Sequence, residues 1–149
     1  MKKPTKLKKI SNKSDMIILK TATSYLIPLL LMFSVFILLR GHYLSGGGFV
    51  GGLIASIAFI LYAFAHTVQE TLKLFKFPPL TLIPVGISLS FLSGFLPVLA
   101  GKPFLTGLWL DVPVAIVGSV GTALFFDLGV YLIVIGVTLT IIFTIIENV

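Results

Sequence analysis

Four long apolar segments, separated by polar or glycine-rich stretches, make up most of this 149-residue chain. Each segment is free of charged side chains and has about the 20 residues that a helix needs to cross about 30 Å of hydrocarbon. The predicted fold class is therefore an all-α integral membrane protein, with residues 1–20 as a basic tail and residues 21–149 as a four-span membrane domain. We predict the membrane-spanning helices at about residues 21–39, 49–65, 80–99 and 128–146.

The stretches between the spans differ in character. A glycine-rich turn, GHYLSGGGFVGG at residues 41–52, joins the first two spans. Residues 100–127 hold too many glycines and prolines for a straight span, yet they are too apolar for an ordinary solvated loop. We predict an interfacial excursion before the fourth span, with a short extended piece at residues 112–117 and Trp109 at the depth of the lipid headgroups. A re-entrant or fifth span over residues 112–126 is the alternative.

Small residues recur at helical spacing along the last three spans. Such spacing lets another helix approach closely in a membrane, where lipid removes the hydrophobic drive for association. On the second span the two neighbouring stripes are Gly48, Gly52, Ser56 and Ala63, and Gly47 with Gly51. On the third and fourth spans the corresponding faces hold Gly86, Ser90, Ser93 and Pro97, and Gly129, Gly136, Thr140 and Thr144. These faces are predicted to pack against other helices.

The composition excludes several classes of protein. With 57% hydrophobic and 11% charged residues and a mean hydropathy of +1.13, the chain is too apolar for a soluble domain. It has no cysteine, which excludes disulfides, thiolate metal sites and thiol catalysis. The sequence also lacks paired carboxylates, a nucleophile with a base, and metal-ligand spacing. The chain is therefore predicted not to be an enzyme, and to have no catalytic residue, no metal site and no cofactor.

The formal charge of +6 arises mainly from the first twenty residues, which hold seven of the eleven basic side chains. No aromatic platform or groove-reading helix accompanies them, so nucleic-acid binding is not expected. A cleaved signal peptide fits poorly, because the apolar run is long and no small-residue cleavage site follows it. The lysines instead predict a tail held near anionic lipid on the cytoplasmic side.

Charge also predicts the orientation in the membrane. Four spans leave both termini on the same side, together with nine basic residues, and leave two on the other side, Arg40 and Lys102. The nine are Lys2, Lys3, Lys6, Lys8, Lys9, Lys13, Lys20, Lys73 and Lys76. Because basic residues accumulate in the cytoplasm, both termini are predicted to be cytoplasmic.

The glycine-rich turn formally contains a dinucleotide-binding pattern, G-x-G-x-x-G, at residues 46–51. That pattern requires a preceding β-strand in a βαβ unit, whereas here it joins two membrane helices. Nucleotide binding is therefore not expected. The glycines supply backbone freedom instead, and amides at a helix N-terminus that can receive an anion, a carbonyl or a neighbouring loop.

Two ionisable residues next to the apolar spans are candidates for function. His42 lies in the glycine turn and titrates near neutrality, which suits proton transfer, although it can equally be an interfacial imidazole bonded to the turn. Asp127 precedes the fourth span and can cap that helix at the positive end of its dipole. Its flanks are apolar, so it can also be a buried carboxylate in an ion path or in a subunit contact.

Taken together, GHYLSGGGFVGG at residues 41–52 and LFFDLGVYLIVIGVTLTII at residues 124–142 resemble the B subunit of Mrp-type multi-subunit cation/proton antiporters, the MnhB family. The corresponding patterns in that family are GHNxPGGGFxGGL and LFDxGVxLxVxGxxLT. The resemblance extends from about Leu31 to the C-terminus. Matching positions are His42, Gly46, Gly47, Gly48, Gly51, Gly52, Asp127, Gly129, Val130 and Gly136. Tyr43 and Ser45 depart from the asparagine and proline of the family pattern, which makes the turn less rigid.

The resemblance implies a non-catalytic membrane subunit of an assembly that exchanges cytoplasmic Na⁺, or another monovalent cation, for external protons. Its implied partners are the other membrane subunits, in the lipid bilayer of a prokaryotic cell membrane. The same domain also occurs in membrane-bound hydrogenase-type complexes, which is one alternative. A purely structural subunit that never touches the ions is the other. The candidate ion-path or subunit-contact residues are His42, Gly46, Gly47, Gly48, Gly51, Gly52, Asp127, Gly129 and Gly136.

Overall fold

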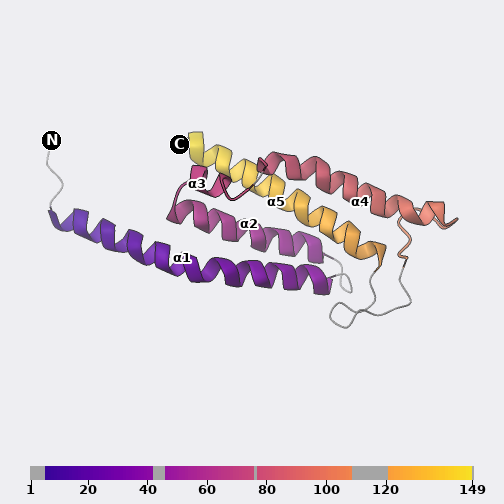
Figure 1. Ribbon diagram of the computed structural model, residues 1–149, viewed down its shortest axis with the longest axis horizontal. Coiled ribbons are helices and arrows are strands. Elements are labelled where there is room, and N and C mark those ends of the chain that lie inside the picture. The colour runs from indigo at the N-terminus through magenta and orange to yellow at the C-terminus, as the bar shows by residue number, and fades with distance from the viewer. Residues whose placement is uncertain (1–5, 42–45, 76, 109–120, 149) are drawn as a thin grey trace.

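Four long helices dominate the computed structural model, which describes residues 6–41, 46–75, 77–108 and 121–148 (Figure 1). They are α1 (Lys6–Arg40), α2 (Gly47–Ala65), α4 (Leu82–Leu99) and α5 (Thr122–Asn148). The short helix α3 (Val68–Leu72) and the 3₁₀ turn η2 (Pro79–Thr81) connect α2 to α4. In the described residues four candidate spans are long and apolar enough to cross a membrane: Met16–Arg40, Gly47–Ala65, Pro79–Leu99 and Thr122–Asn148. The prediction of an all-α membrane protein with four transmembrane helices is confirmed.

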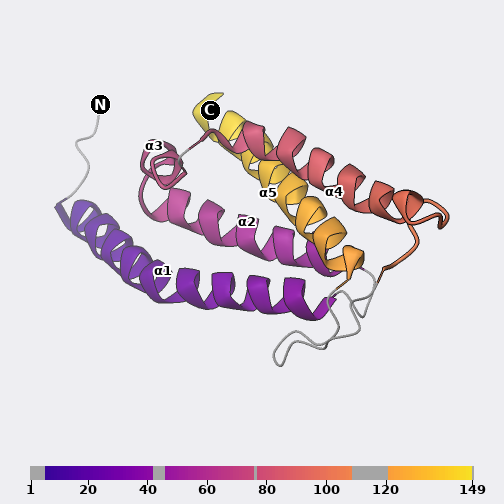
Figure 2. The ribbon, with the colours of Figure 1, turned by 45° about the vertical axis from the view of Figure 1, so that its right-hand side comes forward.

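Two helices begin earlier than the sequence suggested. Helix α1 starts at Lys6 and continues through the basic segment, because residues 6–20 contain neither glycine nor proline to end it. Pro28 lies inside α1, which bends along its length (Figure 2). Helix α5 starts at Thr122, directly after Gly121, so Asp127 lies in the second turn. The expectation that Asp127 stands at the head of the fourth span and caps it is therefore wrong.

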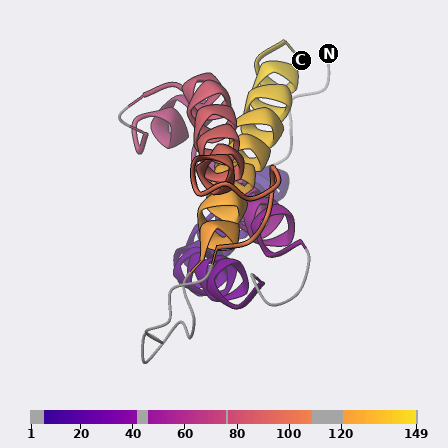
Figure 3. The same ribbon diagram turned by 90° about the vertical axis from the view of Figure 1, so that its right-hand side faces the viewer.

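The helices form a row in the order α1, α2, α5, α4, as the end-on view shows (Figure 3). Each helix contacts its neighbours in the row, whereas α1 barely touches α5. The inner helices are the more covered ones: 44% of the most apolar window of α2 and 33% of that of α5 are buried, against 17% for α1 and 22% for α4. Such a row leaves broad apolar faces open to lipid or to other proteins, including Tyr25 and Met32 of α1, each 77% exposed.

The stripe of Gly47 and Gly51 on α2 faces α1. A Cβ atom added to Gly47 would strike the Cα atom of Gly41 at the end of α1. A Cβ atom on Gly51 would lie 3.0 Å from the carbonyl oxygen of Ser34. The backbones of α1 and α2 can therefore approach this closely because neither stripe position has a side chain.

The stripe that begins with Gly48 and Gly52 faces α5. A Cβ atom on Gly48 would strike the carbonyl group of Asp127, and one on Gly52 would lie 2.9 Å from the Cβ atom of Val134. The two stripes are offset around the helix by one residue, which turns them toward different neighbours. Helix α2 therefore packs against α1 through one glycine stripe and against α5 through the other.

Helices α4 and α5 meet through glycines from both sides. A Cβ atom on Gly86 would lie 2.5 Å from the carbonyl oxygen of Gly129, and one on Gly129 would strike the hydroxyl of Ser90. Two turns further along, a Cβ atom on Gly136 would lie 2.9 Å from the carbonyl oxygen of Pro79. Gly86, Ser90, Gly129 and Gly136 are on the small-residue faces that the sequence predicted for the third and fourth spans.

A cluster of buried apolar side chains lies toward the ends of the helices opposite the glycine turn. It joins α2, α3 and α5 through the buried side chains Ala55, Ala63, Val68, Ile135, Leu139 and Phe143. Helix α3 covers this end, and its first turn is capped by Thr67, whose hydroxyl accepts a hydrogen bond from the backbone nitrogen of Glu70 at 3.1 Å. The start of α1, α3 and the end of α5 lie toward this end (Figure 1).

The contact between α4 and α5 predicts a specific sensitivity. Gly129→Val adds a branched side chain where the backbone of Gly86 and the hydroxyl of Ser90 already lie, so we expect it to destabilise the protein by about 1–3 kcal/mol, the usual cost of overpacking. The measurement is the melting temperature in detergent of a fluorescent-protein fusion. Ala22→Val, at an exposed position of α1, is the matched control and should leave that temperature unchanged. An equal effect of both variants would contradict the assigned contact.

Candidate functional site

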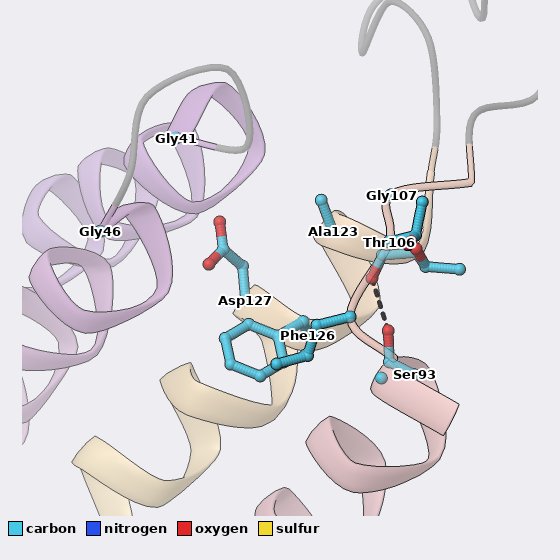
Figure 4. A pocket seen from close by; sticks show the side chains of 11 residues that line it. Gly41, Gly46, Ser93, Thr106, Gly107, Ala123, Phe126 and Asp127 are labelled. Atoms are coloured by element: carbon cyan, nitrogen blue, oxygen red, sulfur yellow. Dashed lines mark hydrogen bonds between the residues drawn. The ribbon is translucent and has the colours of Figure 1, made fainter. Parts of the chain in front are cut away.

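A pocket of about 410 Å³ lies at those ends of the helices where the glycine turn joins α1 to α2 (Figure 4). It is bounded by Gly41 directly after α1, Gly46 directly before α2, the first turns of α5, the second half of α4 and the segment after α4. Its lining residues are Gly41, Gly46, Ser93, Gly94, Leu105, Thr106, Gly107, Thr122, Ala123, Phe126 and Asp127. Seven of these eleven residues have no polar side-chain atom, so the pocket is mainly apolar.

Asp127 supplies the charge in this pocket. Its side chain extends from α5 toward the ends of α1 and α2, where Gly41 and Gly46 lie (Figure 4). Gly46 precedes the first residue of α2 with a φ of 106° and gives that helix no side-chain cap. A carboxylate near the N-terminus of a helix is stabilised by the helix dipole. The start of α2 is thus suited to hold the charge that the second turn of α5 presents.

The three hydroxyl groups of the pocket are engaged with backbone groups around it. The Oγ of Ser93 donates to the carbonyl oxygen of Thr122 at 2.5 Å, which ties α4 to the start of α5. The Oγ1 of Thr122 accepts from the backbone nitrogen of Leu108 at 3.1 Å, and the backbone nitrogen of Thr122 donates to the carbonyl oxygen of Leu108 at 3.0 Å. The Oγ1 of Thr106 donates to the carbonyl oxygen of Pro103 at 2.7 Å. These bonds fix the pocket wall.

The segment after α4 folds back onto that helix. The backbone nitrogen of Leu105 donates to the carbonyl oxygen of Gly94 at 3.1 Å, and a Cβ atom on Gly94 would lie 2.9 Å from the side chain of Leu105. Leu105 has a φ of 65°, a left-handed conformation that a branched apolar residue rarely adopts. The surrounding contacts hold this strained backbone in place, as is common at functional sites.

The predicted irregular stretch at residues 100–127 is only partly described. Residues 109–120 lie outside the described part of the chain, and with them Trp109 and the predicted extended piece at 112–117. Residues 122–126, which the alternative placed at the end of a fifth or re-entrant span, form the first turns of α5.

The nine predicted candidate residues separate into three groups. Gly46 and Asp127 line the pocket. His42 lies outside the described residues. The remaining six are points of close approach between helices: Gly47, Gly48, Gly51, Gly52, Gly129 and Gly136.

The sequence analysis did not predict a polar contact that joins α1, α2 and α5. Ser34 of α1 is fully buried, and its hydroxyl donates to the carbonyl oxygen of Gly51 in α2 at 2.8 Å. The same hydroxyl lies 2.9 Å from that of Tyr131 in α5, so it forms a direct polar contact between α1 and α5. The available indication was a serine in the middle of the run LMFSVF, together with a tyrosine in the fourth span. In lipid such groups need a partner within the protein.

Comparison with known proteins points to one family. Residues 18–140 match the family model described as a domain related to the MnhB subunit of Na⁺/H⁺ antiporter. The chain is 39% identical over 138 residues to the B subunit of the Na⁺/H⁺ antiporter of Bacillus subtilis strain 168, covering 91% of this chain and 96% of that one. It is 36% identical over 135 residues to the putative antiporter subunit mnhB2 of Staphylococcus saprophyticus, covering 89% of this chain and 96% of that one.

A solved structure shares the arrangement of the helices. A chain of the Mrp complex from Dietzia sp. DQ12-45-1b superposes with a TM-score of 0.75 and is 28% identical in sequence. The match covers 96% of this chain but 15% of the other, so this chain spans a small part of that much longer polypeptide. The same four-helix row therefore also occurs as one section of a larger membrane chain.

The link between α1 and α5 can be measured as a coupling energy. We expect Ser34→Ala and Tyr131→Phe each to lower the thermal stability of the detergent-solubilised chain, since each removes one partner of the 2.9 Å contact. A double-mutant cycle should give a coupling of about 0.6 kcal/mol, the average for hydrogen bonds between membrane helices. Ser88→Ala, which removes an exposed hydroxyl bonded within its own helix, serves as the control. Strictly additive effects of the two substitutions would contradict the contact.

Proposed function

We propose that this chain, which belongs to the MnhB family of Na⁺/H⁺ antiporter subunits, works as the B subunit of a multi-subunit assembly that exchanges Na⁺ for protons. It is a multi-pass membrane protein and a component of a transporter, not an enzyme. Its partners are the other membrane subunits of the assembly, and the lipid bilayer surrounds it. The assembly resides in the plasma membrane of a prokaryote.

The observation that carries this proposal is the open row of helices. A transporter that works alone must enclose an ion route between its helices, whereas among the described long helices α4 packs against α5, and α1 packs mainly against α2 with a small contact to α5. The α2 and α5 helices are held by glycine contacts, and the outer faces of α1 and α4 remain apolar and uncovered. This architecture suits a subunit that completes a larger membrane complex.

There are two alternatives to this proposal: one concerns the complex to which the chain belongs, and the other concerns the role of the chain in it. The relatives from Bacillus and Staphylococcus have antiporter names, which favours the antiporter over a hydrogenase-type complex. A purely structural role is the second alternative, because the glycine contacts account for assembly without any ion. Asp127 in the pocket is the observation that favours an additional role beside the ion route.

We propose that the glycine turn and Asp127 lie in one region at the extracytoplasmic surface. There they shape a subunit contact or a part of the ion route, with His42 from the same turn. The pocket that Asp127 and Gly46 share supports this assignment. Residues 1–20 form a cytoplasmic tail and residues 21–149 the membrane domain in this proposal, with both termini in the cytoplasm.

The proposed role predicts a loss of exchange on removal of the charge. The assay uses inverted membrane vesicles from cells that express all subunits of the antiporter. In these vesicles, Asp127→Asn and His42→Ala should each lower the Na⁺/H⁺ exchange rate by about tenfold, equivalent to about 1.4 kcal/mol on the rate-limiting barrier. Glu70→Gln, which changes an exposed acid of α3 at the helix ends away from the pocket, is the matched control. The complex with this variant should exchange Na⁺ for protons normally. A native gel run in parallel reports whether the complex still assembles.

The results separate the alternatives. Lost exchange in an assembled complex supports a role beside the ion route, and lost exchange together with lost assembly supports the structural role alone. Unchanged exchange and assembly in both variants would refute any functional role for these two residues. Deleting the whole chain tests the family function itself, because exchange should then be lost in either case.

The proposed orientation predicts which side of the membrane each loop faces. The chain has no native cysteine, so a single introduced cysteine reports its own position. In intact cells, Lys102→Cys should react with a membrane-impermeant maleimide, whereas Lys73→Cys should react only after the cells are permeabilised. The reverse labelling would show that the termini lie outside the cytoplasm.

A further inference from the structure

We propose that Tyr131 and Ser34 are positioning residues for Asp127: their hydrogen bond fixes the rotation of α5, so that Asp127 faces the ends of α1 and α2. The inference rests on the proposed function, because this orientation matters to exchange only if Asp127 has a role in the antiporter complex. The spacing of the two residues on α5, the direction of the hydrogen bonds and the packing of the tyrosine ring support it.

Asp127 and Tyr131 lie on the same face of α5. Four residues separate them, so Tyr131 lies about 6 Å further along the helix axis and about 40° around it. A rotation of α5 that moved Tyr131 away from α1 and α2 would therefore also turn Asp127 away from them. The side chain of Asp127 extends toward Gly41 and Gly46, at the ends of these two helices (Figure 4).

The hydrogen bonds of Ser34 have a fixed direction. Its hydroxyl has one hydrogen, which it donates to the carbonyl oxygen of Gly51 at 2.8 Å, because a carbonyl can only accept. In the 2.9 Å contact the hydrogen therefore comes from the hydroxyl of Tyr131. The series of bonds ends at a backbone carbonyl, which does not pass a proton onward. It is suited to hold Tyr131 in one orientation, not to conduct protons between α1 and α5.

The ring of Tyr131 is held as well as its hydroxyl. A Cβ atom added to Gly51 would lie 3.4 Å from two carbon atoms of the ring, so the ring packs closely beside this glycine. Ser34, which accepts the hydrogen bond, is fully buried. Because a hydroxyl without a partner is costly inside a membrane, breaking this bond is unfavourable. Tyr131 is thus fixed by α2 along its ring and by α1 at its hydroxyl.

The glycine contacts of α5 constrain its rotation less strongly. At Gly48 a side chain would strike the backbone of Asp127, and at Gly129 it would meet the backbone of Gly86. Dispersion between such atoms depends mainly on their distance. A hydrogen bond, in contrast, weakens steeply when its angle departs from the preferred one. The bond between Tyr131 and Ser34 therefore supplies the angular constraint that the glycine contacts lack.

The first test measures the orientation of position 127 directly. The chain has no native cysteine, so Asp127→Cys can carry a single small fluorine label in the purified full chain. Asp127 also has an interaction of its own within the chain, and this substitution removes its carboxylate, so the label reports mainly what the helix imposes. With Tyr131→Phe or Ser34→Ala, we expect fluorine NMR to show a second orientation populated about threefold more than without them. This factor corresponds to one average hydrogen bond between membrane helices.

The matched control for this test is Tyr25→Phe, which removes the hydroxyl of a tyrosine of α1 that is 77% exposed. It should leave the fluorine spectrum unchanged. Tyr131→Phe and Ser34→Ala remove opposite ends of the same bond, so they should produce the same second resonance. Both substitutions together should have no larger effect than either alone.

The second test shows whether the bond acts through Asp127. In inverted vesicles, with rates expressed per assembled complex, Tyr131→Phe should lower Na⁺/H⁺ exchange about threefold. In a complex that already carries Asp127→Asn, it should lower the remaining exchange no further. A merely structural effect would lower exchange by the same factor in both complexes and would overturn the inference. Tyr25→Phe should leave exchange unchanged.

The two tests separate failure of the inference from failure of the proposed function. A second orientation of the label together with the non-additive loss of exchange supports the positioning role. A label that neither Tyr131→Phe nor Ser34→Ala affects would overturn the inference, whatever happens to exchange. A moved label, with normal exchange in Asp127→Asn, would support the positioning of this residue and refute the role proposed for its carboxylate.

Discussion

The close approach of helix backbones at glycine residues is the constraint on which the rest of this structure depends. Lipid tails are as apolar as leucine, so apolar burial supplies little force between membrane helices. What remains is dispersion between atoms in contact, together with hydrogen bonds, and both act only over short distances. Glycine at each of the three helix contacts brings backbone atoms within that distance. The contact between α2 and α5, at Gly48 and Gly52, connects the two halves of the row.

That constraint also explains why the molecule is open. Helix α2 has one glycine stripe for each of its two neighbours, and the glycines of α5 meet α4 on the side away from α2. The four helices therefore lie side by side in a row and do not close into a bundle. Its outer helices keep the apolar, uncovered faces expected of a subunit whose remaining neighbours are other chains. The polar contact between Ser34 and Tyr131 adds a directional bond where the packing of small residues alone sets only the distance.

The pocket adjoins one of these close approaches, because Gly41 lines the pocket and also meets the backbone of Gly47 in α2. Gly41 after α1 and Gly46 before α2 line this pocket, and the second turn of α5 presents the carboxylate of Asp127 to it. Helix packing and the candidate site are therefore one arrangement. A side chain at Gly41 would change both the distance between α1 and α2 and the volume of the pocket. This link makes the glycine turn more than a connection between two spans.

The sequence by itself determined the fold class, the four spans and the small-residue faces, because apolar length and helical spacing act locally along the chain. It also indicated the family through two motifs, at residues 41–52 and 124–142. It failed at the start of α5: the apolar residues before Asp127 looked like part of a loop, and only contacts of Thr122 with Ser93 and Leu108 show where the helix begins. The order of the row, the partner of each glycine stripe, the pocket around Asp127 and the bond between Ser34 and Tyr131 were decided by tertiary structure. Each joins residues on different helices, and the spacing within one helix contains no information about which neighbour its face will meet.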